Sequence, residues 1–165
     1  FRLFPYLGTA LQALPFFFLF SVFEEFGWRG FLSPKLAKLG VNSPLVYLLT
    51  SVVWATWHLP FIRDLTWVYS SESIATFLPR FYLSMFVYSV LYGELRVRTG
   101  SVWAAVLVHA CANAFGHPLM AEYITTSRGL EVIGSASDGV ITIAMVAALG
   151  VILLVARKKA KPTHS

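Results

Sequence analysis

Long apolar stretches alternate with short polar segments along the whole chain. Each stretch is close to the roughly 20 residues that an α-helix needs to cross a bilayer. The five stretches are Leu7–Phe23, Pro44–Ile62, Ala75–Leu91, Ser101–Phe115 and Val140–Ala156. The pattern therefore predicts an all-α, polytopic membrane helix bundle with about five transmembrane helices, built as a single domain over residues 1–165.

Proline and glycine positions set the expected helix boundaries. The first span continues as helix through residues 24–31, and we expect it to end at Ser33 and Pro34, because proline disfavours helix in the residue before it. Gly93 interrupts the third span near its end. The longest connections are predicted at Arg63–Ile74 and His117–Asp138.

The composition agrees with a lipid environment. Hydrophobic residues make up 57% of the chain and charged residues 13%, whereas soluble domains average about 25% charged. The mean hydropathy is +0.68. The single cysteine, Cys111, excludes an intramolecular disulfide framework and a cysteine-based zinc cluster. Because the chain opens on Phe1 rather than on a methionine, we expect an N-terminal piece to precede it.

Lysine and arginine residues are divided unequally between the two ends of the predicted bundle. The net charge of +5 does not indicate a nucleic-acid partner, because the basic residues lie at the ends of apolar runs. One end has Arg2, Arg63, Arg80 and Arg128; the other has Arg29, Lys35, Lys38, Arg96, Arg98, Arg157, Lys158, Lys159 and Lys161. By the positive-inside rule the second end is cytoplasmic. The sequence thus predicts a multi-pass protein of the plasma (inner) membrane with a cytoplasmic C-terminal tail at residues 157–165.

Three groups of polar residues interrupt the apolar stretches. An ionisable side chain within a span costs roughly 2.5–3.5 kcal/mol on insertion scales, so each group calls for a functional hypothesis. The groups are Glu24, Glu25 and Arg29 at the end of the first span, Trp54 and His58 in the second, and His109 and Asn113 in the fourth.

Helical spacing assigns partners within each group. Glu25 and Arg29 are four residues apart, which favours an ion pair. Glu24 is rotated about 100° away and lacks that partner, so it is a candidate for a general base or acid. The other two pairs, Trp54 with His58 and His109 with Asn113, also share a helix face.

The three groups together resemble the motifs of the CPBP family, the CaaX protease and bacteriocin-processing intramembrane proteases, also called the Abi family. The motifs are Glu-Glu-x-x-x-Arg, aromatic-x-x-x-His and His-x-x-x-Asn, and the segment from Arg98 to Trp103 is also similar to the family. The resemblance covers a catalytic core at about residues 23–115. The family usually has Phe at the position of Trp54, and we expect the larger ring to narrow the site without altering its chemistry. Because family members commonly have additional helices before the first motif, this sequence is expected to lack part of the bundle.

The resemblance implies an intramembrane endopeptidase that cleaves a membrane-associated or lipidated protein or peptide. Its expected partners are this substrate and the lipid bilayer, and we expect no nucleic-acid partner. It implies that Glu24 is the general base and that His58 helps to hold the attacking water. It further implies that His109 and Asn113 stabilise the oxyanion. Glu25, Arg29 and Trp54 would support the site structurally.

Two alternatives to this mechanism and function stay open from the sequence. The family has also been described as zinc-dependent, and Glu24, His58 and His109 would then be the ligands; we favour the metal-free reaction. A membrane transporter or proton-relay protein would use the same ionisable residues but is expected to have repeated halves, which this sequence lacks. A catalytically idle scaffold of the same fold is expected to have lost a motif residue.

The remaining polar and aromatic residues are predicted to lie near the membrane surfaces. His117, next to Pro118, is expected to be interfacial rather than catalytic. Glu94 and Arg96 are expected to form a pair in a cytoplasmic loop. Tryptophan and tyrosine residues near the span ends fit an interfacial aromatic belt.

Overall fold

The described part of the chain folds as a helical bundle. The computed structural model describes residues 1–63, 73–123, 131–134 and 137–160. The long helices are α1 (Leu3–Glu25), α3 (Ser43–Trp57), α5 (Ile74–Thr99), α6 (Val102–Pro118) and α8 (Val140–Ala160). The short elements are α2 (Ser33–Lys38), α4 (Leu59–Arg63), α7 (Glu131–Gly134) and two π-helical segments, η1 (Phe26–Leu32) and η2 (Leu119–Tyr123). The predicted all-α class is confirmed.

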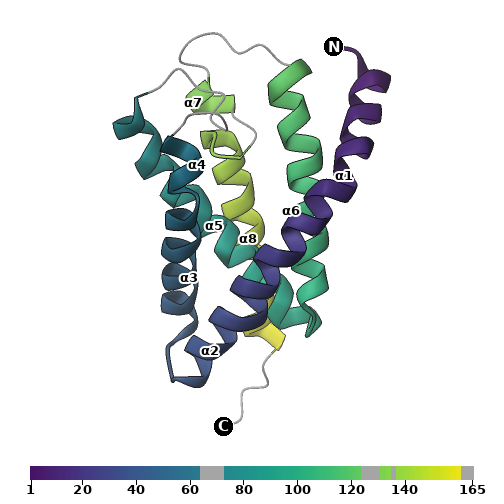
Figure 1. Cartoon of the computed structure of the whole chain (residues 1–165). Helices are drawn as coiled ribbons and strands as arrows, with labels where there is room; N and C mark the ends of the chain where they lie inside the picture. The colour runs from purple at the N-terminus through teal and green to yellow at the C-terminus, as the bar shows by residue number, and fades with distance from the viewer. Residues whose placement is uncertain (64–72, 124–130, 135–136, 161–165) are drawn as a thin grey trace.

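The five long helices run alternately in opposite directions, so the start of α1 and the end of α8 lie at opposite ends of the bundle (Figure 1). Three helical stretches are long and apolar enough to cross a membrane, at Leu3–Lys38, Ile74–Thr99 and Val140–Arg157. The other two long helices, α3 and α6, have 15 and 17 residues and are shorter than a full span. The predicted connection Arg63–Ile74 lies almost wholly outside the described residues, as do Arg128 and Lys161.

The first helix does not end at Ser33 and Pro34 as predicted. It widens into the π-helical segment η1 directly after Glu25 and then continues as α2 to Lys38. The amide of Ser33 donates to the carbonyl of Trp28, five residues back, so the register before the proline is not that of an α-helix. The chain therefore passes Pro34 in the first turn of α2, where a missing amide hydrogen is tolerated.

The second predicted span is broken into α3 and α4 at His58. Pro60 has no amide hydrogen, and its ring would clash with the carbonyl of Thr56 in a continuous α-helix. The backbone amide of His58 donates instead to the carbonyl of Ala55 in a tighter turn. This break leaves the carbonyl of Trp54 without its usual helical donor.

Two other helices extend beyond their predicted ends. Helix α5 does not stop at Gly93 but continues to Thr99. Gly93 lies against the ring of Tyr47, where an added Cβ would be 2.5 Å from Cε1. Glycine at this position thus permits close packing of α5 on α3. Helix α6 includes His117 and runs directly into η2, so the predicted connection at His117–Asp138 begins later than expected.

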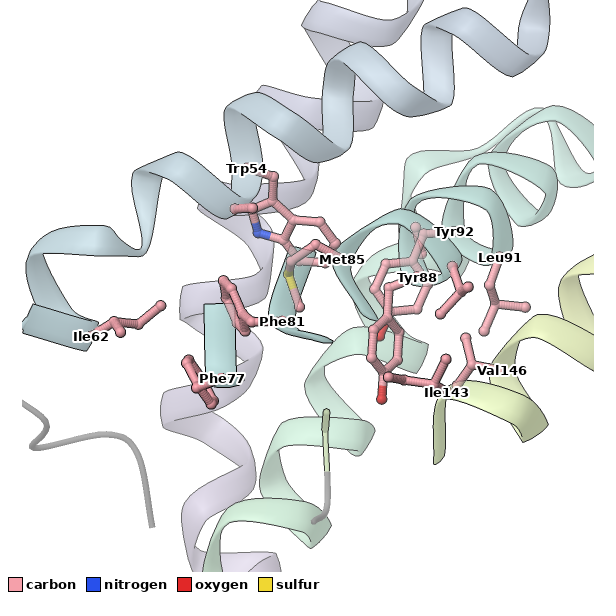
Figure 2. Packing of buried hydrophobic residues seen from close by; sticks show 13 residues of the cluster. Trp54, Ile62, Phe77, Phe81, Met85, Tyr88, Leu91, Tyr92, Ile143 and Val146 are labelled. Carbon is pink, nitrogen blue, oxygen red and sulfur yellow. The ribbon is translucent and has the colours of Figure 1, made fainter. Parts of the chain in front are cut away.

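The hydrophobic core is organised around α5. This helix is buried on several faces in its C-terminal half and packs between α3 and α8, and Figure 2 shows its side chains of Phe81, Met85, Tyr88 and Tyr92. Helix α1 packs most extensively on α6, whereas α5 contacts α3, α6 and α8. The polar residues of the three motifs therefore lie where α1, α3, α5 and α6 meet.

A second buried polar group connects α3, α5 and α8. The Glu94 side chain is fully buried, accepts a hydrogen bond from the Tyr47 hydroxyl and forms an ion pair with Arg157 at 3.0 Å. The prediction that Glu94 belongs to a cytoplasmic loop pair with Arg96 is wrong. Helix α5 continues past this position, and Glu94 faces its neighbouring helices rather than water.

Candidate active site

Glu25 is the centre of a buried ionic group at the junction of α1 and η1. Its Oε1 atom lies 2.8 Å from Nη1 of Arg29 and 2.9 Å from Nδ1 of His109. The side chains of Glu25 and Arg29 are almost completely buried, and His109 is 5% exposed. The predicted ion pair between Glu25 and Arg29 is therefore present, and the structure adds His109 from α6 as a second partner of the same oxygen.

Aromatic faces surround the guanidinium group of Arg29. The guanidinium carbon lies 4.4 Å from the ring centroid of Trp54 and 5.2 Å from that of Tyr92. Within the described residues its Nε and Nη2 atoms have no hydrogen-bond partner, so the two ring faces supply much of its compensation for burial. Arg29 lies in η1, and π-helical turns occur frequently at functional sites.

Glu24 has a different environment from that of Glu25. Its Oε2 atom accepts a hydrogen bond of 2.7 Å from the indole Nε1 of Trp54. Among the described residues, Trp54 is the one hydrogen-bond donor to the Glu24 carboxylate, and no cation pairs with this carboxylate. Glu24 is 8% exposed, compared with 0% for Glu25. The two adjacent carboxylates are thus distinguished by geometry: one is paired and inaccessible, and the other is not.

Trp54 makes more than a steric contribution. The sequence suggests only that its bulk narrows the site, but its indole N–H holds the Glu24 carboxylate, which a phenylalanine could not do. Its ring also lies 5.5 Å from the ring of His109, nearly perpendicular to it. Trp54 therefore links all three motif helices, α1, α3 and α6.

The break after α3 orients the ring of His58. Its Nδ1 atom lies 2.8 Å from the carbonyl oxygen of Trp54, the carbonyl that the helix break leaves free. A carbonyl oxygen only accepts, so Nδ1 carries the hydrogen and Nε2 of the neutral ring has a lone pair. Trp57 and Phe81 pack edge-on against the imidazole and hold its plane.

The structure locates Asn113 less directly than the other predicted residues. It is half-buried on α6, one turn beyond His109 and on the same face. Among the described residues no hydrogen bond of its side chain is recorded. Asn113 is therefore assigned to the site by its spacing of four residues from His109 on α6, and not by an observed side-chain contact.

Sequence reasoning missed Tyr92, which packs its ring on His109. The two rings are stacked with centroids 5.3 Å apart and an angle of 25°. Tyr92 is 2% exposed, in contrast to the expected interfacial position of tyrosines near span ends. Tyr92 follows the buried Tyr88 by four residues, so the two side chains share a face of α5. This spacing is the signal that could have identified Tyr92 as buried.

The donor atoms of the three predicted zinc ligands do not come together. Within the described residues no group of three or more His, Cys, Asp or Glu side chains has an arrangement that could hold a metal ion. The Nδ1 atom of His109 contacts the Glu25 carboxylate and the Nδ1 atom of His58 contacts a main-chain carbonyl, so Nε2 is the atom of each ring that these two contacts leave available.

The fold and the site together define a membrane-embedded helical protein with a buried Glu–His–Arg centre. A comparison with protein-family models matches residues 6–115 to the family described as Type II CAAX prenyl endopeptidase Rce1-like. Because the match covers more than half of the chain, this protein belongs to that family of CAAX-protease-type enzymes. The resemblance to the CPBP family is thereby confirmed. Searches among curated proteins and among solved structures found no match.

Proposed function

We propose that this protein hydrolyses a peptide bond of a membrane-associated or lipidated substrate with a water molecule activated by Glu24. The observation that carries the proposal is the unequal environment of the two adjacent carboxylates. Glu25 is held by Arg29 and His109, whereas among the described residues the donor to Glu24 is the neutral Trp54 indole. A carboxylate without a cationic partner has an oxygen available to accept a proton from water.

His58 is suited to hold the attacking water. With its hydrogen on Nδ1 and directed to the Trp54 carbonyl, the ring offers the Nε2 lone pair as an acceptor for a water O–H. Glu24 and His58 both contact Trp54, one through the indole N–H and the other through the main-chain carbonyl. Trp54 thereby keeps the two water-binding groups on one side of the site.

His109 is suited to stabilise the oxyanion as an imidazolium. Its Nδ1 donates to the Glu25 carboxylate, so Nε2 is a second donor only when the ring is protonated. Asn113, one helical turn away, would supply the second donor, and each donor is worth about 3–4 kcal/mol.

The reaction balances with these residues alone. The water oxygen forms a bond to the substrate carbonyl carbon while Glu24 takes one water proton, and the carbonyl oxygen becomes an anion between His109 and Asn113. The anion then reforms the carbonyl as the C–N bond breaks. Glu24 returns its proton to the leaving nitrogen, so the products are a carboxylic acid and an amine.

The deciding experiment is a peptidase assay of the purified protein in detergent. The substrates are a farnesylated peptide that ends in a CaaX sequence and a membrane-anchored peptide without a prenyl group. Glu24→Gln should abolish turnover while substrate binding and thermal stability stay near wild type, because the amide keeps the shape and can still accept from Trp54. Glu122→Gln, at an exposed glutamate in η2, is the matched control and should be fully active.

Asn113→Ala and metal analysis test the mechanism within the same assay. Asn113→Ala should lower kcat by about 10²–10³ with little change in KM, the effect of losing one oxyanion donor. Metal content is measured on the active protein, before and after treatment with a strong chelator. A zinc-to-protein ratio near one that follows activity through chelation and restoration would refute the glutamate mechanism.

A further inference from the structure

Two arginines meet where the transmembrane helices α5 and α8 end. Both helices are long and apolar enough to cross a membrane, and the two apolar stretches end at Thr99 and Arg157. The helices pack extensively on each other, and their last turns lie at the same end of the bundle (Figure 1). Arg98 and Arg157 therefore lie at the depth where lipid headgroups replace the hydrocarbon.

The guanidinium group of Arg98 is held on α8 by one nitrogen. Its Nη1 atom donates to the carbonyl oxygen of Leu153 at 3.3 Å. In an α-helix this carbonyl also accepts from the amide four residues further on, which is that of Arg157. Arg98 is exposed, and among the described residues this is its one hydrogen bond. Its other N–H groups are therefore available to an acceptor outside the protein.

Arg157 is held from the interior of the bundle, also through one nitrogen. Its Nη1 atom lies 3.0 Å from Oε1 of the buried Glu94 and 3.5 Å from the hydroxyl of Tyr47. Within the described part of the chain its contacts use this atom, and the side chain remains 23% exposed. Helical side chains tilt towards the N-terminus, so this guanidinium lies back over the turn that contains Leu153. The two guanidinium groups thus converge on one turn of α8.

The surroundings of this turn favour an anion that carries acyl chains. Lys159, which is exposed, adds a third cation two residues beyond Arg157. Arginine binds phosphate through two parallel N–H groups, and basic side chains between the ends of membrane helices attract anionic headgroups. Val97 and Val155 are exposed in the last turns of the same two helices, where acyl chains would contact them. A soluble anion would match the cations but not these apolar neighbours.

We propose that Arg98 and Arg157 bind the phosphate of an anionic phospholipid at the junction of α5 and α8. The phosphate accepts from the outer N–H groups of both guanidinium groups, and the acyl chains lie along the two helices. Bound in this way, the lipid joins the ends of α5 and α8 and stabilises the folded protein. Both residues lie outside the buried Glu–His–Arg centre, so the site does not depend on peptide cleavage.

The test measures lipid binding to the purified full chain in a neutral detergent. The unfolding temperature is followed against the concentration of dioleoylphosphatidylglycerol, or of zwitterionic dioleoylphosphatidylcholine for comparison. The anionic lipid should raise the unfolding temperature, and phosphatidylcholine should not. Arg98→Gln should raise the apparent Kd of the anionic lipid about tenfold, because one charge-assisted contact with the phosphate is lost. Arg98→Lys keeps the charge and should bind more tightly than Arg98→Gln.

The choice of variants separates a defined site from general attraction and from misfolding. Arg98 is changed rather than Arg157, because loss of Arg157 would also leave Glu94 without its cation. Lys38→Gln removes the same charge from an exposed position of α2 at the same end of the bundle, and its affinity should stay within twofold of wild type. Each variant is compared with its own unfolding temperature without lipid, so a destabilised variant still yields a Kd.

Three outcomes would overturn the proposal. An equal loss of affinity in Lys38→Gln would show that the basic end attracts anionic lipid without a defined site. An unchanged affinity in Arg98→Gln, or equal stabilisation by phosphatidylcholine, would exclude a phosphate contact at Arg98. Inorganic phosphate that stabilises the wild type as strongly as the anionic lipid, and less so Arg98→Gln, would make this a site for free phosphate instead.

Discussion

At the scale of single residues, the two adjacent carboxylates of the site differ in their partners: Glu25 pairs with cationic groups, and Glu24 accepts a hydrogen bond from a neutral indole. Glu24 and Glu25 are adjacent in sequence, yet α-helical rotation turns one towards Trp54 and the other towards Arg29 and His109. Because both are buried in a bundle with few other charges, each partner has a large electrostatic effect. The different environments of the two carboxylates, on which their proposed roles rest, thus follow from about 100° of helix rotation.

The hydrogen bond from Trp54 to Glu24 should affect catalysis. Trp54→Phe removes a donor to a charged group at a site where the family usually has Phe, so the fold should be kept while the carboxylate is held less well. We expect kcat to fall about tenfold with KM nearly unchanged, within the range for a hydrogen bond to a charge. Trp103→Phe, at an exposed tryptophan, is the matched control. Wild-type kcat in Trp54→Phe would show that the indole acts through its bulk alone.

Glu25 should matter first for stability. Glu25→Gln leaves Arg29 and His109 without their anionic partner in a buried site, and breaking such a pair costs about 3–5 kcal/mol. The variant should therefore show a lowered unfolding temperature and reduced yield, whereas Glu24→Gln should not. A Glu25→Gln protein as stable as wild type but inactive would make Glu25 the catalytic carboxylate instead.

At the scale of helices, irregular turns produce the geometry of the site. The π-helical segment η1 follows directly after Glu25 and contains Arg29, and the break at His58 frees the Trp54 carbonyl that orients the His58 ring. Both irregularities adjoin a motif residue. Regular α-helix at either place would give the side chains a different direction, so the turns are part of the site rather than defects next to it.

The ion pair between the buried Glu94 and the partly exposed Arg157 should hold α8 against α5. Helix α8 lies beyond the part of the chain that matches the family model, so this pair attaches it to the core. Arg157→Gln should destabilise the protein by about 3 kcal/mol, because it leaves the fully buried Glu94 carboxylate without its cation. Glu94→Gln should cost less, because the Arg157 side chain is 23% exposed and water can solvate it. The double variant should lose clearly less than the sum of both.

Thermal unfolding in detergent measures this cycle. Lys159→Gln, at an exposed position of the same helix, is the control and should have the stability of the wild type. Strict additivity of the two single changes would show that the ion pair contributes no coupling, and that burial of each side chain by itself determines stability.

At the scale of the whole molecule, alternating helix directions bring basic residues to one end of the bundle. Helix α2, with Lys35 and Lys38, and the end of α5, with Arg96 and Arg98, lie at the same end of the bundle as the end of α8 (Figure 1). The membrane side of that end is a prediction from the positive-inside rule. Arg29, counted for this rule in the sequence, is buried in the site and not exposed to the headgroups.

Cysteine labelling of intact cells tests the orientation. In a Cys111→Ala background, Leu39→Cys and Lys159→Cys should resist a membrane-impermeant maleimide, because both lie at the predicted cytoplasmic end. Ile74→Cys, at the start of α5 and exposed, should be labelled. Labelling of Leu39→Cys and Lys159→Cys from outside, with Ile74→Cys protected, would reverse the assigned topology.

The sequence by itself determined the helical class, the five long helices, the pairing of Glu25 with Arg29 and the three motifs that identify the family. These features are local, since they depend on runs of apolar residues and on spacing within one helix. The tertiary structure alone decided that His109 contacts Glu25, that Tyr92 packs on His109, and that Glu94 is buried against α3 and α8. The physical reason is that a membrane helix is apolar on nearly every face. Its pattern therefore does not reveal which face meets another helix, and only packing determines that rotation.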